Sequence, residues 1–196
     1  MKSTKIIDRV AYAAKLSAGK CVLDIGGQKM EGTPPNCRFA RAYSKIQQST
    51  KEYKIVDYQN KSTVDYVVDF NKPKSIPEIR RIITEFKPDV ILCMELLEHV
   101  NYHFELMNEL ARAIKEHNSE IFITVPNNGN WIINLMGWNR DHSISFLKGV
   151  AERFIKRSDL GQHHVQMFGC LGKYHPAWPI IYTLAGAVSW GFRITK

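Results

Sequence analysis

The sequence predicts an α/β fold, with a mostly parallel central sheet and helices on both faces. Two observations predict it. Short apolar runs rich in β-branched residues alternate with longer segments of helical periodicity, and several of the short runs end in an acidic residue or glycine. The 196 residues are enough for one compact domain with a sizeable core and too few for two ordinary ones.

The amino-terminal part is expected to form one helix and three strands. The alternation of charged and apolar residues predicts a helix over Lys5–Ser17 that Gly19 ends, and the strands are expected over Lys20–Ile25, Tyr53–Asp57 and Val64–Asp69. Only residues 58–63 separate the last two strands, whereas a parallel crossover normally needs about a dozen residues. Either this join is an irregular loop without a helix, or one of the two strands is misassigned.

The middle of the chain continues the alternation of helix and strand. Apolar spacing predicts a helix over Ile76–Phe86 that stops before Lys87-Pro88, as proline requires. The elements expected next are a strand over Val90–Met94, a helix over Phe104–His117 and a strand over Ile121–Val125.

The pattern is weaker after Pro126. Helices are expected over Trp131–Met136, Ser145–Ile155 and His175–Ser189, a loop over Gly161–Gly172 and a last strand over Gly191–Thr195. If no further strand follows, the sheet is one strand short, and its exposed edge is available for pairing with another subunit.

The net charge of the chain indicates which kinds of partner it can bind, and the spacing of its cysteines indicates its redox environment. The net charge of +8 suits an anionic partner, namely nucleic acid, a phosphorylated metabolite or an acidic membrane surface, and equally a solubilising lysine-rich surface. The cysteines lack metal-site spacing, which favours a reducing, cytoplasmic location and argues against structural zinc or any other metal. They are Cys21, Cys37, Cys93 and Cys170.

One uncharged stretch, residues 176–192, raises the question of a membrane. A spanning helix needs about 20 apolar residues, and this stretch is shorter and contains two prolines and two glycines. We expect a buried helix that leads into a strand, with an interfacial membrane contact as the alternative.

Polar residues follow most of the predicted strands. In an open parallel sheet the ligand binds beyond the carboxyl ends of the strands, so these residues should gather at one edge. Glycine after the first strand lets backbone approach a ligand closely, and an acid after the second can accept hydrogen bonds from ribose hydroxyls. The inferred ligand is a nucleoside-bearing cofactor. The residues concerned are Asp24, Gly26, Gly27, Asp57, Asp69, Glu95, Pro126 and Asn127.

These motifs resemble class I S-adenosylmethionine-dependent methyltransferases, above all the small-molecule type with an "evLEHv" signature. The similar segments are VLDIGG at 22–27, IVDY at 55–58, VVDF at 67–70, DVILCMELLEHV at 89–100 and ITVPNN at 123–128. The resemblance implies a Rossmann-like fold and one methyltransferase domain over 1–196, with the cofactor half at 1–128 and acceptor-binding and carboxyl-terminal elements at 129–196.

The resemblance also implies S-adenosylmethionine as cofactor and a role for each matching residue. Asp24, Gly26 and Gly27 would form the turn under the methionine part. Asp57, with Tyr58 beside it, would hold the ribose hydroxyls, and Asp69 with Phe70 would bind the adenine. Met94 and Glu95 would border the methionine end.

The sequence departs from the family motif at two glycines, which are replaced by Gln28 and Met30. This departure motivates an alternative class, a methyltransferase-like binding protein that has lost turnover. A nicotinamide-dependent oxidoreductase is disfavoured because it needs the fuller GxGxxG turn. The residues from Lys29 to Thr50 are expected to form part of an acceptor site or a surface loop.

No catalytic residue is obvious, because a sulfonium methyl group needs alignment and exclusion of water more than a base. The candidates for a base or an acceptor contact are His99, His142 and His163, and each is equally explained as a locally hydrogen-bonded histidine. Among acceptors a small molecule, methylated at oxygen or nitrogen, is favoured by the "evLEHv" signature, and nucleic acid is the alternative.

Overall fold

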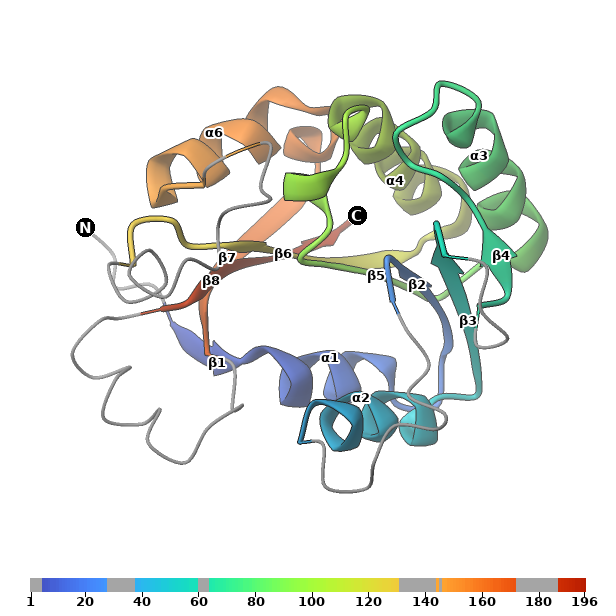
Figure 1. Cartoon of the computed structure of the whole chain (residues 1–196), viewed down its shortest axis with the longest axis horizontal. Coiled ribbons are helices and arrows are strands. Elements are labelled where there is room, and N and C mark those ends of the chain that lie inside the picture. Colours follow the sequence, from blue (N-terminus) through green and yellow to red (C-terminus); the bar gives the residue numbers. More distant parts are fainter. Residues whose placement is uncertain (1–4, 28–37, 60–63, 131–143, 145, 172–186) are drawn as a thin grey trace.

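The structure of the chain is a computed structural model that describes residues 5–27, 38–59, 64–130, 144, 146–171 and 187–196. Its described part forms an eight-stranded sheet in the order β1-β7-β8-β6-β5-β2-β3-β4. Helices α1 and α2 cover one face of this sheet, and α3, α4 and α6 cover the other (Figure 1). The predicted α/β class, with helices on both faces, is confirmed.

The bounds of the elements follow the chain. The strands are β1 (Ile6–Asp8), β2 (Cys21–Ile25), β3 (Glu52–Asp57), β4 (Tyr66–Val67), β5 (Val90–Met94), β6 (Glu120–Pro126), β7 (His164–Leu171) and β8 (Ser189–Thr195). The α-helices are α1 (Arg9–Ser17), α2 (Arg38–Ser49), α3 (Ser75–Phe86), α4 (His103–His117) and α6 (Lys148–Arg157). Two 3-10 turns complete the described part, η1 (Leu97–His99) and η2 (Asp159–Gln162).

Parallel pairing brings the carboxyl ends of the central strands to one edge. β2 pairs in parallel with β3 and β5, and β5 pairs in parallel with β6. Asp24 of β2 lies level with Ile55 of β3 and Leu92 of β5, so the residues that follow each strand emerge at similar height. We call this side of the sheet the ligand edge.

The prediction of a single helix over Lys5–Ser17 is wrong at its start. Ile6–Asp8 instead form β1, which pairs in parallel with β7, and the helix begins only at Arg9. The reason is local: the Asp8 carboxylate caps α1, with Oδ1 accepting hydrogen bonds from the backbone N–H groups of Val10 and Ala11 at 3.1 Å. Two adjacent isoleucines before this cap favour an extended chain.

The prediction of a loop over Gly161–Gly172 is also wrong, since most of these residues belong to η2 and β7. β8 lies antiparallel between β6 and β7, so the last strand is inside the sheet and the sheet is not one strand short. Among the described strands, the short strands β1 and β4 lie at its edges. Three glycines and two histidines in the sequence of residues 161–172 concealed a strand whose residues Phe168–Cys170 are buried.

Two further expectations differ in detail. The segment between Lys29 and Thr50, expected to form part of an acceptor site or a surface loop, contains α2. The third predicted strand shrinks to the two residues of β4, which pair in parallel with Val56 and Asp57 of β3. The helix expected over 131–136 and most of the one expected over 175–189 lie outside the described residues. No helix in the described part is long and apolar enough to cross a bilayer.

Two apolar layers hold the ligand edge in place. On one face Ile91 and Ile123 of the sheet pack with residues of α3, α4 and α6, and on the other Leu92 and Phe122 pack against α1 and α2. β5 is buried along its whole length, which explains why its sequence, VILCM, is uniformly apolar. The residues just beyond β5 therefore project from a rigid centre.

Candidate cofactor site at the ligand edge

Asp24 is the most deeply buried polar group at the carboxyl end of β2. Only 1% of it is exposed, and the Tyr53 hydroxyl of β3 donates a hydrogen bond to its Oδ2. Gly27 lies over the same carboxylate: a Cβ on Gly27 would be 2.2 Å from Oδ2. Asp24 therefore supports the backbone of the turn from beneath, and only glycine fits above it.

Gly26 forms the bend between β2 and this turn. Its φ of +81° is in the left-handed region that glycine adopts without strain. Its N–H donates to the Val56 carbonyl at 2.7 Å, so the turn is fastened to β3. Sequence reasoning places Gly26 and Gly27 at this turn, and the structure does the same.

Burial raises the pKa of Asp24 to about 7, and the nearby Asp57 carboxylate adds to the rise, while the hydrogen bond from Tyr53 opposes it. Val56 pairs with Ile25, so Asp57, the next residue of β3, lies at the same end of the sheet as Asp24. A carboxyl group with this pKa changes its charge near neutral pH.

Asp57 ends β3 and is 5% exposed. Its Oδ1 accepts a hydrogen bond from the Gln59 N–H at 2.8 Å, which fixes the side chain at the edge. Tyr58, which follows, is 61% exposed, and its hydroxyl accepts a hydrogen bond from the Gln59 amide.

Asp69 lies beyond β4, and its carboxylate is engaged locally. It accepts from the Asn71 N–H at 3.1 Å and pairs with Lys72 at 3.0 Å. These contacts with Lys72 and Asn71 lower its pKa. Phe70 is 4% exposed and packs in the core shared with α3 and α4, so its ring is not presented at the surface.

β5 delivers Met94 and Glu95. The Met94 side chain packs into the apolar layer next to α1, whereas Glu95 turns out of the strand with a φ of +54°. Glu95 Oε1 forms an ion pair with Nη1 of Arg9 at 2.8 Å, and the same guanidinium donates to the Ser189 hydroxyl at 3.1 Å. Arg9 thus ties the end of β5 to α1 and β8.

Sequence reasoning missed the part that Arg9 and Glu98 play here. Glu98 is 1% exposed, and its Oε2 has no hydrogen-bond partner. Burial, reinforced by the charge of Glu95, raises its pKa well above the ordinary value, and Arg9 opposes this rise. Glu98 lies in η1, between the end of β5 and the start of α4. Nothing in the sequence distinguishes a buried acid from an exposed one at this position.

The three histidine candidates separate in space. His99 lies at the ligand edge with its side chain 43% exposed and its Nε2 3.9 Å from Glu98 Oε1. His142 lies outside the described residues. His163 precedes β7, which runs parallel to β1 and in the same direction as β6, so it lies at the opposite, amino-end edge of the sheet. This position is far from the turn that follows β2 and argues against a role for His163 at the cofactor site.

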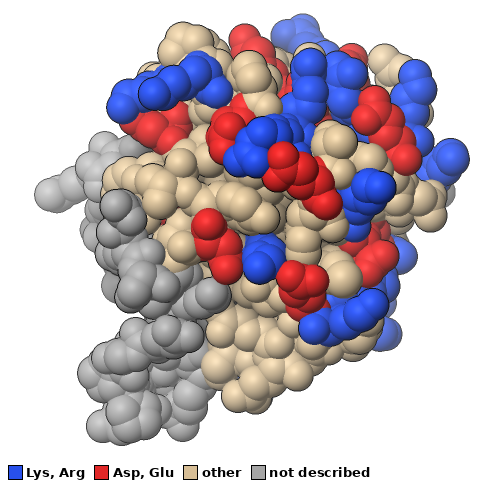
Figure 2. Space-filling model, turned by 90° about the vertical axis from the view of Figure 1, so that its right-hand side faces the viewer, with Lys and Arg blue, Asp and Glu red and all other residues tan. Residues whose placement is uncertain are grey.

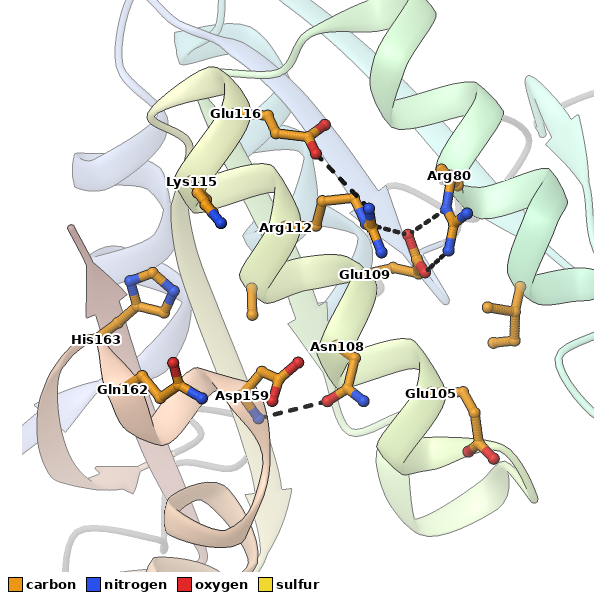
Figure 3. A pocket seen from close by; sticks show the side chains of 12 residues that line it. Arg80, Glu105, Asn108, Glu109, Arg112, Lys115, Glu116, Asp159, Gln162 and His163 are labelled. Carbon is orange, nitrogen blue, oxygen red and sulfur yellow. Dashed lines mark hydrogen bonds and ion pairs between the residues drawn. The ribbon is translucent and has the colours of Figure 1, made fainter.

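His163 instead borders a groove of about 540 Å³ along α4 (Figure 3). The centre of the groove is an ion-pair cluster in which Glu109 is held by Arg80, at 2.6 and 2.9 Å, and by Arg112 at 3.3 Å. None of the predicted cofactor residues lines this groove. Its main charged groups neutralise one another, as expected for contacts that join α3 to α4.

The family assignment follows from comparison with known proteins. The family model described as a methyltransferase domain matches residues 2–154, so the chain belongs to this family, as its motifs indicated. None of the curated proteins is significantly similar in sequence.

Solved structures share the fold at low sequence identity. A SAM-dependent methyltransferase from Archaeoglobus fulgidus superposes with a TM-score of 0.61 and 14% identity, covering 95% of this chain and 90% of that one. An S-adenosylmethionine-dependent methyltransferase from Mesorhizobium loti gives 0.55 and 11%, covering 96% of both chains. The small RNA methyltransferase HEN1 gives 0.56 and 14%, covering 96% of this chain and 25% of that one.

Proposed function

We propose that this protein transfers a methyl group from S-adenosylmethionine to an acceptor bound over the ligand edge. The observation that carries the proposal is the contact between Gly27 and the buried Asp24 carboxylate, beside the Asp57 carboxylate of the next strand. Together these groups supply a bare stretch of backbone and an acceptor for hydroxyl groups, which are the two features that a nucleoside cofactor requires.

The residues present fit this cofactor. The Asp24 carboxylate fills the space that a side chain at Gly27 would need, so this position requires glycine, which has no side chain to shield the backbone of the turn from a ligand. Asp57 is buried and held by Gln59, and its carboxylate is suited to accept hydrogen bonds from a ribose diol. When bound, the cofactor supplies a methyl group activated by its sulfonium charge. Asp69 and Phe70 fit less well, since one is engaged with Lys72 and the other lies in the core.

The chain's own residues orient the reactants and shape the local charge. Glu95, held by Arg9, borders the methionine end, and the buried Glu98 lies behind it. A preorganised pair of charges such as Glu95 and Arg9 stabilises a changing charge at the reacting centre without reorganisation. His99 is the described histidine placed to accept a proton from a hydroxyl acceptor and release it to solvent.

The class of acceptor is a separate part of the proposal. The resemblance to the "evLEHv" type supports a small molecule, whereas the fold similarity to HEN1, a protein named as a small RNA methyltransferase, supports nucleic acid. Helix α6, whose sequence KGVAERFIKR has four basic residues and one acid, favours nucleic acid. The replacements Gln28 and Met30, which motivate a catalytically inactive binding protein, lie outside the described residues.

Calorimetry tests the cofactor site. S-adenosylmethionine and S-adenosylhomocysteine should both bind the wild-type protein, and Asp57→Asn should weaken binding by about tenfold, the loss expected when one charge-assisted hydrogen bond is removed. Asp159→Asn, an exposed acid of η2, serves as the matched control and should leave both affinities unchanged. Absence of binding by either compound would favour the inactive binding protein.

A further inference from the structure

Helix α6 carries an unbalanced positive charge. Its sequence, KGVAERFIKR, contains four basic residues and one acid, Glu152. Three of the basic residues, Arg153, Lys156 and Arg157, are exposed, and their i, i+3, i+4 spacing places them on one face of the helix. The helix is about 15 Å long at 1.5 Å per residue, so this face presents three cations within two turns.

These three cations differ from the arginines of the neighbouring helices. In the described part of the chain Arg153, Lys156 and Arg157 form no ion pair, whereas Arg81 of α3 pairs with Glu78 and Glu85 at 2.6 Å each. The face of the molecule that lies to the right in Figure 1 accordingly shows lysine and arginine interleaved with acids (Figure 2). The positive charge of α6 is therefore available to an external anion.

Aromatic rings lie next to this cationic face. His103 and Phe104, at the start of α4, contact Phe154 of α6 and each other, with ring centroids 4.9 to 5.0 Å apart. Phe104 is 39% exposed, and Leu147, just before α6, is 53% exposed. The rings of a partner can therefore stack or pack at the end of α4, while its charges meet α6.

The aromatic cluster adjoins the ligand edge. α4 begins four residues after η1, which itself follows β5. Phe146 contacts Phe154 at 5.1 Å, and its backbone exchanges hydrogen bonds with Asn128, two residues beyond β6. A partner bound to the cluster would thus extend from the proposed methyl-transfer site along α6.

We propose that α6 and this aromatic cluster form a docking surface for single-stranded nucleic acid, which presents the acceptor. The inference rests on the proposed function and names its acceptor class. Phosphates spaced along a strand complement a row of unpaired cations, and unstacked bases bind exposed rings, which a duplex does not offer. The acids close to this surface include Glu105 beside Phe104 and Asp159 just beyond α6. Within α6 itself Glu152 offsets one of the four basic residues, which leaves the net charge of the helix at +3.

Fluorescence anisotropy with a labelled short single-stranded oligonucleotide tests the proposal. The triple variant Arg153→Gln/Lys156→Gln/Arg157→Gln should bind the oligonucleotide at least about tenfold more weakly. The slope of the logarithm of the binding constant against the logarithm of the salt concentration should become shallower by about 2, because each lost phosphate contact contributes about 0.7. Replacing three exposed lysines elsewhere, Lys51, Lys74 and Lys115, by Gln is the matched control and should change binding less than about twofold.

A second variant separates stacking from charge. Phe104→Ala should weaken binding of the oligonucleotide and leave binding of heparin, a polyanion without bases, unchanged. Equal losses in the triple variant and its control, or preference for a duplex or for anionic phosphatidylserine vesicles, would overturn the proposal. The triple variant should still bind S-adenosylmethionine, so loss of nucleic-acid binding is distinguishable from failure of the cofactor site.

Discussion

The α-carbon of Gly27 lies against the carboxylate of Asp24, with no space between them for a methyl group. Gly27→Ala should therefore push the turn off the acid, destabilise the fold by about 1–3 kcal/mol and weaken cofactor binding. Urea unfolding and calorimetry measure the two effects. Gly149→Ala, in α6 where nothing lies within 4 Å of the added Cβ, should be neutral or stabilising by up to about 1 kcal/mol. Equal effects of the two substitutions would contradict the close contact.

Asp24 should make stability depend on pH in a direction opposite to that of most acids. Because burial raises its pKa to about 7, folding favours the protonated form, and this stability is lost as pH rises from about 4 through 7. Asp24→Asn cannot ionise, so its free energy of unfolding should rise relative to wild type across this range by up to about 4 kcal/mol. A constant difference between pH 4 and pH 8 in urea titrations would sink this account. Tyr53→Phe, which removes the opposing hydrogen bond, should shift the transition to higher pH.

Removing Arg9 should be costly because it leaves a carboxylate without its counter-ion. Arg9→Met should destabilise the protein by about 3 kcal/mol, since Arg9 is 8% exposed and pairs with Glu95 at 2.8 Å. Adding Glu95→Gln to this variant should recover part of the loss, which a double-mutant cycle measures. Arg81→Met, whose ion pairs are exposed, should cost less than about 1 kcal/mol. Strict additivity of the two changes at Arg9 and Glu95 would show that the pair is not coupled.

Glu109 should hold α3 against α4. Its carboxylate is 5% exposed and receives two hydrogen bonds from Arg80 as well as the contact with Arg112. Glu109→Ala should cost about 2–3 kcal/mol, as expected for a buried group hydrogen-bonded to charged partners. Thermal unfolding measures the change, with the exposed Glu105→Ala as a control expected to lie within about 0.5 kcal/mol of wild type. A Glu109 variant as stable as this control would show that the cluster contributes nothing.

The central strands were predictable because a strand that is buried on both faces has a continuous apolar sequence, such as VILCM in β5. The acidic residues at the ends of these apolar runs are easy to recognise in the sequence. β7 was not predictable in this way, since Gly169 and His164 break the pattern and pairing with β8 from the end of the chain supplies its stability. The start of α1 depends on Asp8, whose capping role emerges only once the chain before it is held by β7.

The candidate site divides along similar lines. Asp24, Gly26 and Asp57 could be located from sequence because strand ends and glycine turns are local features. The engagement of Asp69 with Lys72 and the burial of Glu98 could not, since both depend on which side chains lie nearby in three dimensions. Arg9 is the clearest case: it is separated from Ser189 by 180 residues and yet donates to its hydroxyl.

The order of the strands has a consequence for biosynthesis. The first described strand, β1, pairs with β7, and the central strand β6 pairs with β8, the last described element. During translation the nascent chain therefore carries β6 with one row of unpaired backbone groups until residues 189–195 have emerged, which is a state open to chaperones and to self-association.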